Sequence, residues 1–139
     1  MSVEEENLTR QRRIWEEIFN EGNLEIISEL IDTNWVEHTP MGDIRGPEGF
    51  KVGPDIFRTA FPDLHVTIED IFAKDDRVVS RVTMTGTFKG EYRGTPANGN
   101  KFVLRANLIN RWSEGKQVEA WAEYNMLEFY RQLGIPIPE

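Results

Sequence analysis

The chain has 139 residues, a length typical of a single domain that can bury a core with a cavity in it. Hydrophobic residues make up 39% of it and aromatic residues 11%, which excludes a disordered acidic segment. A net charge of -8 opposes binding to a phosphate backbone, and the lack of cysteine excludes disulfides, thiolate nucleophiles and cysteine-based zinc sites.

The first ten residues, MSVEEENLTR, lack the basic start and apolar run of a signal peptide. No segment approaches 18 uninterrupted apolar residues, and no dense stripe of Lys and Arg stands out. We therefore expect a cytoplasmic protein, one domain spanning residues 1–139, with neither a membrane nor nucleic acid as a partner.

Two amphipathic helices are predicted at the start of the chain. Ser2 and Glu5 have capping-box spacing ahead of an apolar stripe that ends at Gly22. Asn23 can cap a second helix, in which apolar residues repeat every three or four positions until residues 32–33.

A short extended segment at residues 35–38 and a loop at residues 40–47 are expected next. Pro47 suits the first position of a third helix, which Pro62 closes. We expect this helix to be irregular at Gly53-Pro54, because proline lacks the N–H donor and clashes with the preceding turn.

The second half of the chain has the pattern of four strands, at residues 64–74, 77–92, 101–112 and 117–127. Their short connectors imply an antiparallel meander, with one longer loop at residues 93–100. Residues 127–134, LEFYRQLG, can add one or two helical turns. Helices followed by long strands indicate an α+β fold, in which the wedge between the two layers suits a small ligand.

The facing of the last strand is left open by its pattern. With period two, one side carries Glu119, Trp121, Glu123 and Asn125, and the other carries Ala120, Ala122, Tyr124 and Met126. Neither side is plainly apolar. The pattern therefore does not decide which row lines a pocket and which faces water.

His38 is the better candidate of two histidines for acid-base chemistry near neutral pH, since it lies where a strand meets a loop, with Glu37 beside it on the opposite face. A hydrogen bond to a turn carbonyl is the structural alternative. His65 fits a strand position at which its side chain is exposed or hydrogen-bonded. The two histidines have no metal-ligand spacing and the carboxylates form no calcium loop, so no metal is expected.

Arginines inside the strands reach either the solvent or the cavity. Arg81 is the one we favour as internal, with Glu119 or Glu123 as its partner, although a surface position or an ion pair is the commoner outcome. Aromatic residues supply the expected wall of the pocket: Trp35, Phe57, Phe61, Phe88, Phe102 and Trp121.

Three segments resemble the SnoaL-like polyketide cyclases of the nuclear transport factor 2-like superfamily. They are HTPMGDIRGPEGFK at residues 38–51, FPDLHVTIEDIFAKDDRVVSRVTMTGTFKGEYRGTP at residues 61–96 and VEAWAEYNMLEFYRQLG at residues 118–134. The resemblance covers nearly all of the chain after the first helix.

The resemblance implies a cone-shaped α+β barrel, with helices on a strongly curved antiparallel sheet, an apolar cavity, and a homodimer or homotetramer built on the sheet. It also implies ring closure by an intramolecular aldol reaction on a polyketide ester, without metal or organic cofactor. In such cyclases an aspartate near the end of the last strand acts as acid and base.

Asn125 takes the position of that aspartate, and Phe88 stands where related sequences often have histidine. An amide exchanges no proton near neutral pH but donates a hydrogen bond to an enolate oxygen, which leaves His38 to move the proton. The ligand-binding residues expected are Trp35, Phe57, Phe61, Arg81, Phe88, Trp121 and Glu123. A non-catalytic binder of a small apolar molecule and an oligomeric interaction module are the alternatives.

Overall fold

The computed structural model describes residues 1–137 and confirms the α+β class. In chain order the elements are α1 (Val3–Arg13), the π-helix η1 (Ile14–Asn20), the 3-10 turn η2 (Leu24–Ile26), α2 (Ile27–Leu30), β1 (Ile31–Thr39), β2 (Gly42–Arg45), α3 (Gly46–Ala60), β3 (His65–Lys74), β4 (Arg77–Thr87), β5 (Lys101–Ser113), β6 (Lys116–Tyr124) and α4 (Met126–Leu133).

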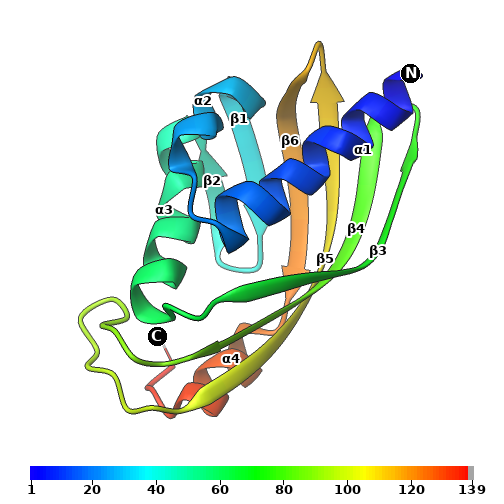
Figure 1. Ribbon diagram of the computed structural model, residues 1–139. Coiled ribbons are helices and arrows are strands. Elements are labelled where there is room, and N and C mark those ends of the chain that lie inside the picture. The colour runs from blue at the N-terminus through cyan, green and yellow to red at the C-terminus, as the bar shows by residue number, and fades with distance from the viewer. Residues whose placement is uncertain (138–139) are drawn as a thin grey trace.

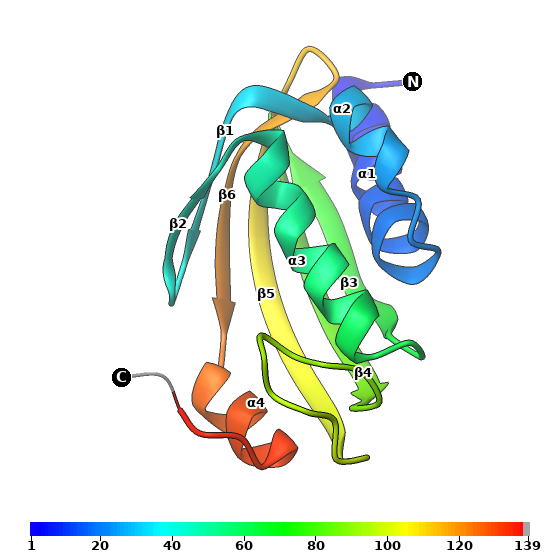
Figure 2. The ribbon, with the colours of Figure 1, turned by 90° about the vertical axis from the view of Figure 1, so that its left-hand side faces the viewer.

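A curved six-stranded sheet with strand order β2-β1-β6-β5-β4-β3 forms one layer. Figure 1 shows β3, β4 and β5 bending around the helices, with α4 closing one end. The antiparallel meander from β3 to β6 is confirmed, whereas β1 joins β6 in parallel and makes the sheet mixed. In the side view of Figure 2, α3 lies across the sheet and α1 and α2 lie beside it.

Ser2 caps the first helix, and the predicted pairing of Ser2 with Glu5 is confirmed through the Ser2 hydroxyl. The Ser2 hydroxyl accepts a hydrogen bond from the backbone N–H of Glu5 at 3.1 Å and donates to the Glu5 carboxylate at 3.1 Å. The helix then continues as η1 and ends before Gly22, which has a φ of 75°.

The second helix is shorter than its apolar repeat predicts. Leu30 ends α2, and Ile31 already has extended backbone angles and pairs with Gln117 of β6. Pairing with the sheet therefore overrides the helical spacing, and β1 is a full strand instead of a short segment. The loop expected at residues 40–47 contains β2, which pairs with β1.

The third helix is confirmed, but it runs without a break through Gly53 and Pro54. Pro54 gives up one helical hydrogen bond. Its ring is buried and forms part of the apolar wall of a cavity between α3 and the sheet, although proline is unfavourable inside a helix.

Gly90 shows why the GTFKG segment, residues 86–90, has glycine at its end. A Cβ on Gly90 would lie 2.0 Å from the carbonyl oxygen of Thr59 at the end of α3. The backbone N–H groups of Lys89 and Gly90 both donate to the carbonyl of Ala60 at 3.0 Å. Close backbone approach therefore excludes any side chain here.

The apolar interior consists of two clusters. One surrounds Phe61 and includes Phe88, Phe102 and Phe129, and the other surrounds Trp35 and includes residues of η1 and α2. Residues of both clusters line the cavity, which lies where the two meet.

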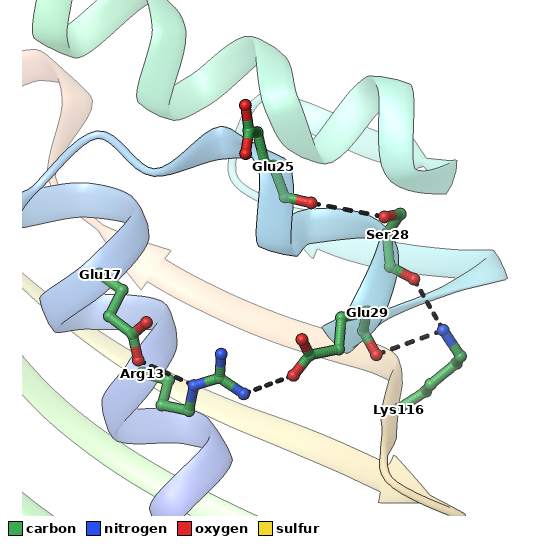
Figure 3. A network of polar contacts seen from close by, with 6 residues as sticks. All are labelled: Arg13, Glu17, Glu25, Ser28, Glu29 and Lys116. Atoms are coloured by element: carbon green, nitrogen blue, oxygen red, sulfur yellow. Dashed lines mark hydrogen bonds and ion pairs between the residues drawn. The ribbon is translucent and has the colours of Figure 1, made fainter.

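A surface network joins α2 to the α1–η1 segment and, separately, to the start of β6 (Figure 3). Arg13 bridges the carboxylates of Glu17 and Glu29 at 2.8 Å and 2.5 Å. Lys116 donates to the carbonyls of Ser28 at 2.7 Å and Glu29 at 3.2 Å, where α2 ends. The Arg13, Glu17 and Glu29 side chains are 31%, 32% and 59% exposed, so water screens these ion pairs and each adds little stability.

Candidate functional site

A cavity of about 560 Å³ lies between the sheet and the helices. Apolar side chains form most of its wall, among them Trp15, Phe57 and Leu104. Exposed residues of the β1–β2 hairpin and of the loop after β4, such as Met41 and Arg93, line its open end. A concave apolar space with a few polar groups is typical of a small-molecule site.

Two carboxylates among residues 1–137 line this cavity, Glu37 in its interior and Asp43 at its exposed rim. Period two along β1 turns Trp35, Glu37 and Thr39 inward, and all three line the cavity. Burial disfavours the charged form and raises the pKa of Glu37 to about 7. A carboxyl group with such a pKa can both accept and donate a proton near neutral pH.

Tyr124 lines the same cavity from β6. Burial is the main cause that raises the pKa of its phenol, while an interaction with Thr39 opposes the rise and the charge of Glu37 adds to it. The phenol therefore stays protonated and can donate a hydrogen bond close to Glu37.

A buried amide network closes the inner end of the cavity. Gln117 accepts hydrogen bonds from the Trp35 indole at 3.0 Å and from the amide of Asn110 at 3.1 Å. Gln11 accepts from the Trp112 indole at 3.3 Å and from Gln117 at 3.1 Å. Gln11, Asn110 and Gln117 are at most 3% exposed and also line the cavity.

The side of β6 that faces the cavity is the one opposite to our expectation. Ala122 and Tyr124 point inward, and Met126 follows them, whereas the row of Glu119, Trp121, Glu123 and Asn125 lies on the outer face. The inner row is weakly apolar because its alanines are small, and the volume that they leave free belongs to the cavity. On the outer face the Trp121 ring lies 5.7 Å from the His38 ring and 5.4 Å from the Arg77 guanidinium.

His38 therefore lies outside the cavity, in a chain of charges on the outer face. Its Nδ1 faces Asp43 at 3.0 Å and its Nε2 faces Glu119 at 2.8 Å. Glu119 also accepts from Arg111 at 3.1 Å. Hydrogen bonding to Glu119, and then to Asp43, raises the pKa of His38. Two carboxylate partners favour an imidazolium that keeps both protons, the opposite of a free base.

Asn125 also lies outside the cavity, with its side chain engaged by the backbone. Its Oδ1 accepts a hydrogen bond from the N–H of Glu128 at 3.0 Å, so it caps α4. Arg81 and Glu123 are exposed on the outer face. The Nε of Arg81 pairs with Asp70 at 2.7 Å, not with Glu119 or Glu123, because β3 and not β6 is the strand beside it at that position.

The aromatic residues divide between the wall and the core. Trp35 and Phe57 line the cavity. Phe61 and Phe88 are fully buried within the cluster around Phe61, where the Phe61 and Phe102 rings lie 4.5 Å apart. Phe61 and Phe88 therefore belong to the packed core behind the cavity wall and do not line the cavity.

Several polar residues of the cavity were not assigned to it from the sequence, among them Glu37, Tyr124, Asn110, Gln11 and Gln117. Period two could have found Glu37, because Trp35 and His38 are three residues apart on one strand and cannot both point inward. Within residues 1–137, no three His, Asp or Glu side chains gather into a group that could hold a metal ion. No helix in this part of the chain is long and apolar enough to cross a membrane.

Comparison with curated proteins identifies two relatives of known name. Aklanonic acid methyl ester cyclase DnrD of Streptomyces peucetius is 29% identical over 131 residues, which cover 88% of this chain and 87% of DnrD. Aklanonic acid methyl ester cyclase DauD of Streptomyces sp. strain C5 is 30% identical over 117 residues, which cover 81% of this chain and 70% of DauD.

Solved structures share the fold along nearly the whole chain. A SnoaL-like protein from Jannaschia sp. CCS1 has a TM-score of 0.86 at 18% identity, with 99% of this chain and 97% of that chain covered, and supports the fold alone. IdmH of Streptomyces antibioticus has a TM-score of 0.76 at 30% identity, with 91% and 97% covered. A family model described as SnoaL-like polyketide cyclase matches residues 9–133. The chain therefore belongs to the SnoaL-like polyketide cyclase family.

Proposed function

We propose that this protein is a cofactor-independent enzyme that closes a ring on a polyketide-like ester by an intramolecular aldol reaction. The observation that carries the proposal is a carboxyl group, Glu37, in an apolar cavity that raises its pKa to about 7. The names of DnrD and DauD, both methyl ester cyclases, indicate the substrate class.

Glu37 acts first as the base. Its carboxylate takes a proton from the carbon between two carbonyl groups of the substrate. The resulting enolate then attacks the carbon of a further carbonyl group in the same molecule. A carbon–carbon bond forms, and the attacked carbonyl becomes an alkoxide. Glu37 returns its proton to that oxygen, so the product is an isomer of the substrate and the carboxylate is regenerated.

Tyr124 supplies a hydrogen bond to the enolate oxygen. Its protonated phenol lies in the cavity within electrostatic range of Glu37. A donor aimed at developing negative charge in a largely apolar site stabilises the transition state more than it would in water. In this proposal Glu37 and Tyr124 take the roles that the sequence assigned to His38 and Asn125.

Incubation with aklanonic acid methyl ester tests the proposal. We expect a product of unchanged mass with a new retention time in liquid chromatography–mass spectrometry, formed faster than in buffer or with heat-denatured protein. Binding of the ester without conversion would contradict catalysis and favour the alternative of a non-catalytic binder. Absence of both binding and conversion would contradict the proposed substrate class.

We also propose that the protein forms a homodimer through the outer face of the sheet. Cross-strand pairs align Phe72, Val79, Ile109 and Trp121 in one row across four strands. Phe72 is 57% exposed and Ile109 is 40% exposed. Positive and negative side chains, paired as Arg81–Asp70 and Arg111–Glu119, flank this row. A face with charges of both signs can pack on a second copy of itself.

Replacement of Ile109 with Glu should convert the dimer to a monomer, since it places a charge in the centre of the row. Size-exclusion chromatography with light scattering measures the mass. Val52→Glu, a comparable change at a 48% exposed position of α3 on the cavity side instead of the outer face of the sheet, should leave the dimer intact. A monomeric wild-type protein would refute this assembly.

A further inference from the structure

We propose that the inner end of the cavity is a recognition site for a hydroxyl group of the ligand, and that Oδ1 of Asn110 accepts its hydrogen bond. The orientations of three buried amides and the place of Asn110 in the sheet support this site. It deepens the proposed function by naming a chemical feature of the substrate.

Two tryptophans lock the amide orientations. An indole N–H only donates, so the atom of Gln117 that faces Trp35 at 3.0 Å is an oxygen. The same reasoning assigns an oxygen to the atom of Gln11 that faces Trp112 at 3.3 Å. The nitrogen of Gln117 then donates to the oxygen of Gln11 at 3.1 Å, in agreement with both amide orientations.

The orientation of Asn110 follows from that of Gln117. Because the Gln117 oxygen only accepts, the Asn110 atom that lies 3.1 Å from it is the nitrogen. The oxygen of Asn110 therefore points away from the network. It has no hydrogen-bond partner within residues 1–137, although Asn110 is 2% exposed and lines the cavity.

A buried acceptor without a partner is costly, and few occur in folded proteins. The group that satisfies this oxygen must be a donor, since the network fixes the oxygen and excludes a rotated amide. An ether, ester or ketone oxygen cannot fill the position, whereas a hydroxyl can. The cavity thus discriminates by hydrogen-bond polarity at this end, because the oxygens of Gln11 and Gln117 already have partners and, in the described part of the chain, only that of Asn110 lacks one.

The sheet places Asn110 in one row with Glu37. Asn110 pairs with Ala120, and Ala120 pairs with Glu37, so a single alanine separates the two polar side chains on the same face. Strand spacing puts their Cα atoms about 10 Å apart. A fused ring system in the cavity can span this distance, with its hydroxyl at Asn110 and its reacting carbon toward Glu37. The arrangement therefore selects a ring system that carries a hydroxyl group at the end remote from its reacting carbon.

Binding of three bicyclic ketones tests the site: 6-hydroxy-1-tetralone, 6-methoxy-1-tetralone and unsubstituted 1-tetralone. By titration calorimetry, we expect the wild-type protein to bind the hydroxy compound about tenfold more tightly than either other ketone, as one additional buried hydrogen bond provides. Asn110→Leu, which removes the acceptor at similar volume, should bind all three with affinities within about twofold.

Asn107→Leu is the matched control, because Asn107 is exposed on the outer face of the same strand. It should keep the tenfold preference. If the leucine variant at 110 fails to fold, Asn110→Ala takes its place, and 1-tetralone binding verifies that the cavity is intact. A wild-type protein that does not prefer the hydroxy compound, or an Asn110 variant that still does, would overturn the inference. These measurements record binding only, so failure of the ring-closure assay leaves the inference standing.

Discussion

Replacement of Glu37 with Gln should lower the rate of ring closure about 100-fold or more, the usual contribution of a general acid or base. The amide has nearly the same shape as the carboxyl group, but it neither accepts the substrate proton nor returns it. Steady-state rates with aklanonic acid methyl ester measure the loss. Glu123→Gln, the same change at an exposed position of β6, is the matched control and should keep the wild-type rate.

The same variant should be more stable than the wild type above neutral pH. Burial raises the pKa of Glu37 to about 7 from its ordinary 4.5, so the folded protein holds this proton more tightly than the unfolded chain. The protonated carboxyl contributes stability that is complete below pH 4.5 and is lost as the pH rises through 7. At pH 8 we expect Glu37→Gln to raise the free energy of unfolding by about 1–3 kcal/mol, discounted for contact of the cavity with solvent. Urea unfolding at pH 5 and pH 8 measures the difference, and a variant less stable than wild type at pH 8 would contradict the assigned pKa.

Replacement of Phe61 with Ala should lower the free energy of unfolding by about 3–5 kcal/mol. Phe61 has no exposed surface, and its ring lies 4.5 Å from that of Phe102 and 6.0 Å from that of Phe129. Removal of the ring leaves a void that this packed aromatic cluster cannot close. Denaturant unfolding gives the value.

Leu127→Ala, at a 59% exposed position of α4, provides the comparison and should cost less than about 0.5 kcal/mol. A loss below about 1 kcal/mol for Phe61→Ala would show that the site collapses around the void or was loosely packed. In that case Phe61 would regain the role of a pocket-wall residue that the sequence suggested for it.

Local sequence signals predicted most of the helices and the meander because each of these depends on neighbours in the chain. The cap that Ser2 forms with Glu5 and the left-handed Gly134 after α4, with a φ of 70°, act within one turn of helix. The strands from β3 to β6 are joined by tight connectors or a single loop, so their order follows the chain. β1 was harder to predict, because it pairs with β6, some 80 residues away in the chain.

The facing of β6 could not be read from its residues. Trp121 suggests an inner row by hydrophobicity, yet its ring is covered on the outer face by His38 and Arg77. Ala120 and Ala122 carry little hydrophobic signal, although they are almost fully buried. A strand beneath a cavity needs small inward residues. Hydrophobic periodicity detects large apolar side chains, so it does not reveal a row of alanines that leaves room for a cavity.

The polar groups of the site were hidden for a related reason. Asn110 lies between Leu108 and Trp112 on the inner row of β5, where a polar residue carries no hydrophobic signal. Its burial depends on Gln11 from α1 and Gln117 from β6, whose side chains meet only in the folded molecule. Glu37 was noted only as the neighbour of His38, and its environment is set by residues of α3 and β6.

The pH dependence of ring closure by the wild-type protein tests the central claim most directly. After subtraction of the uncatalysed rate, kcat/KM should rise with pH and level off with an apparent pKa of about 7, the value for Glu37, and this inflection should be missing from the residual activity of Glu37→Gln. A profile without an inflection near pH 7, or the same inflection in the variant, would contradict the assignment of Glu37 as the group that moves the proton.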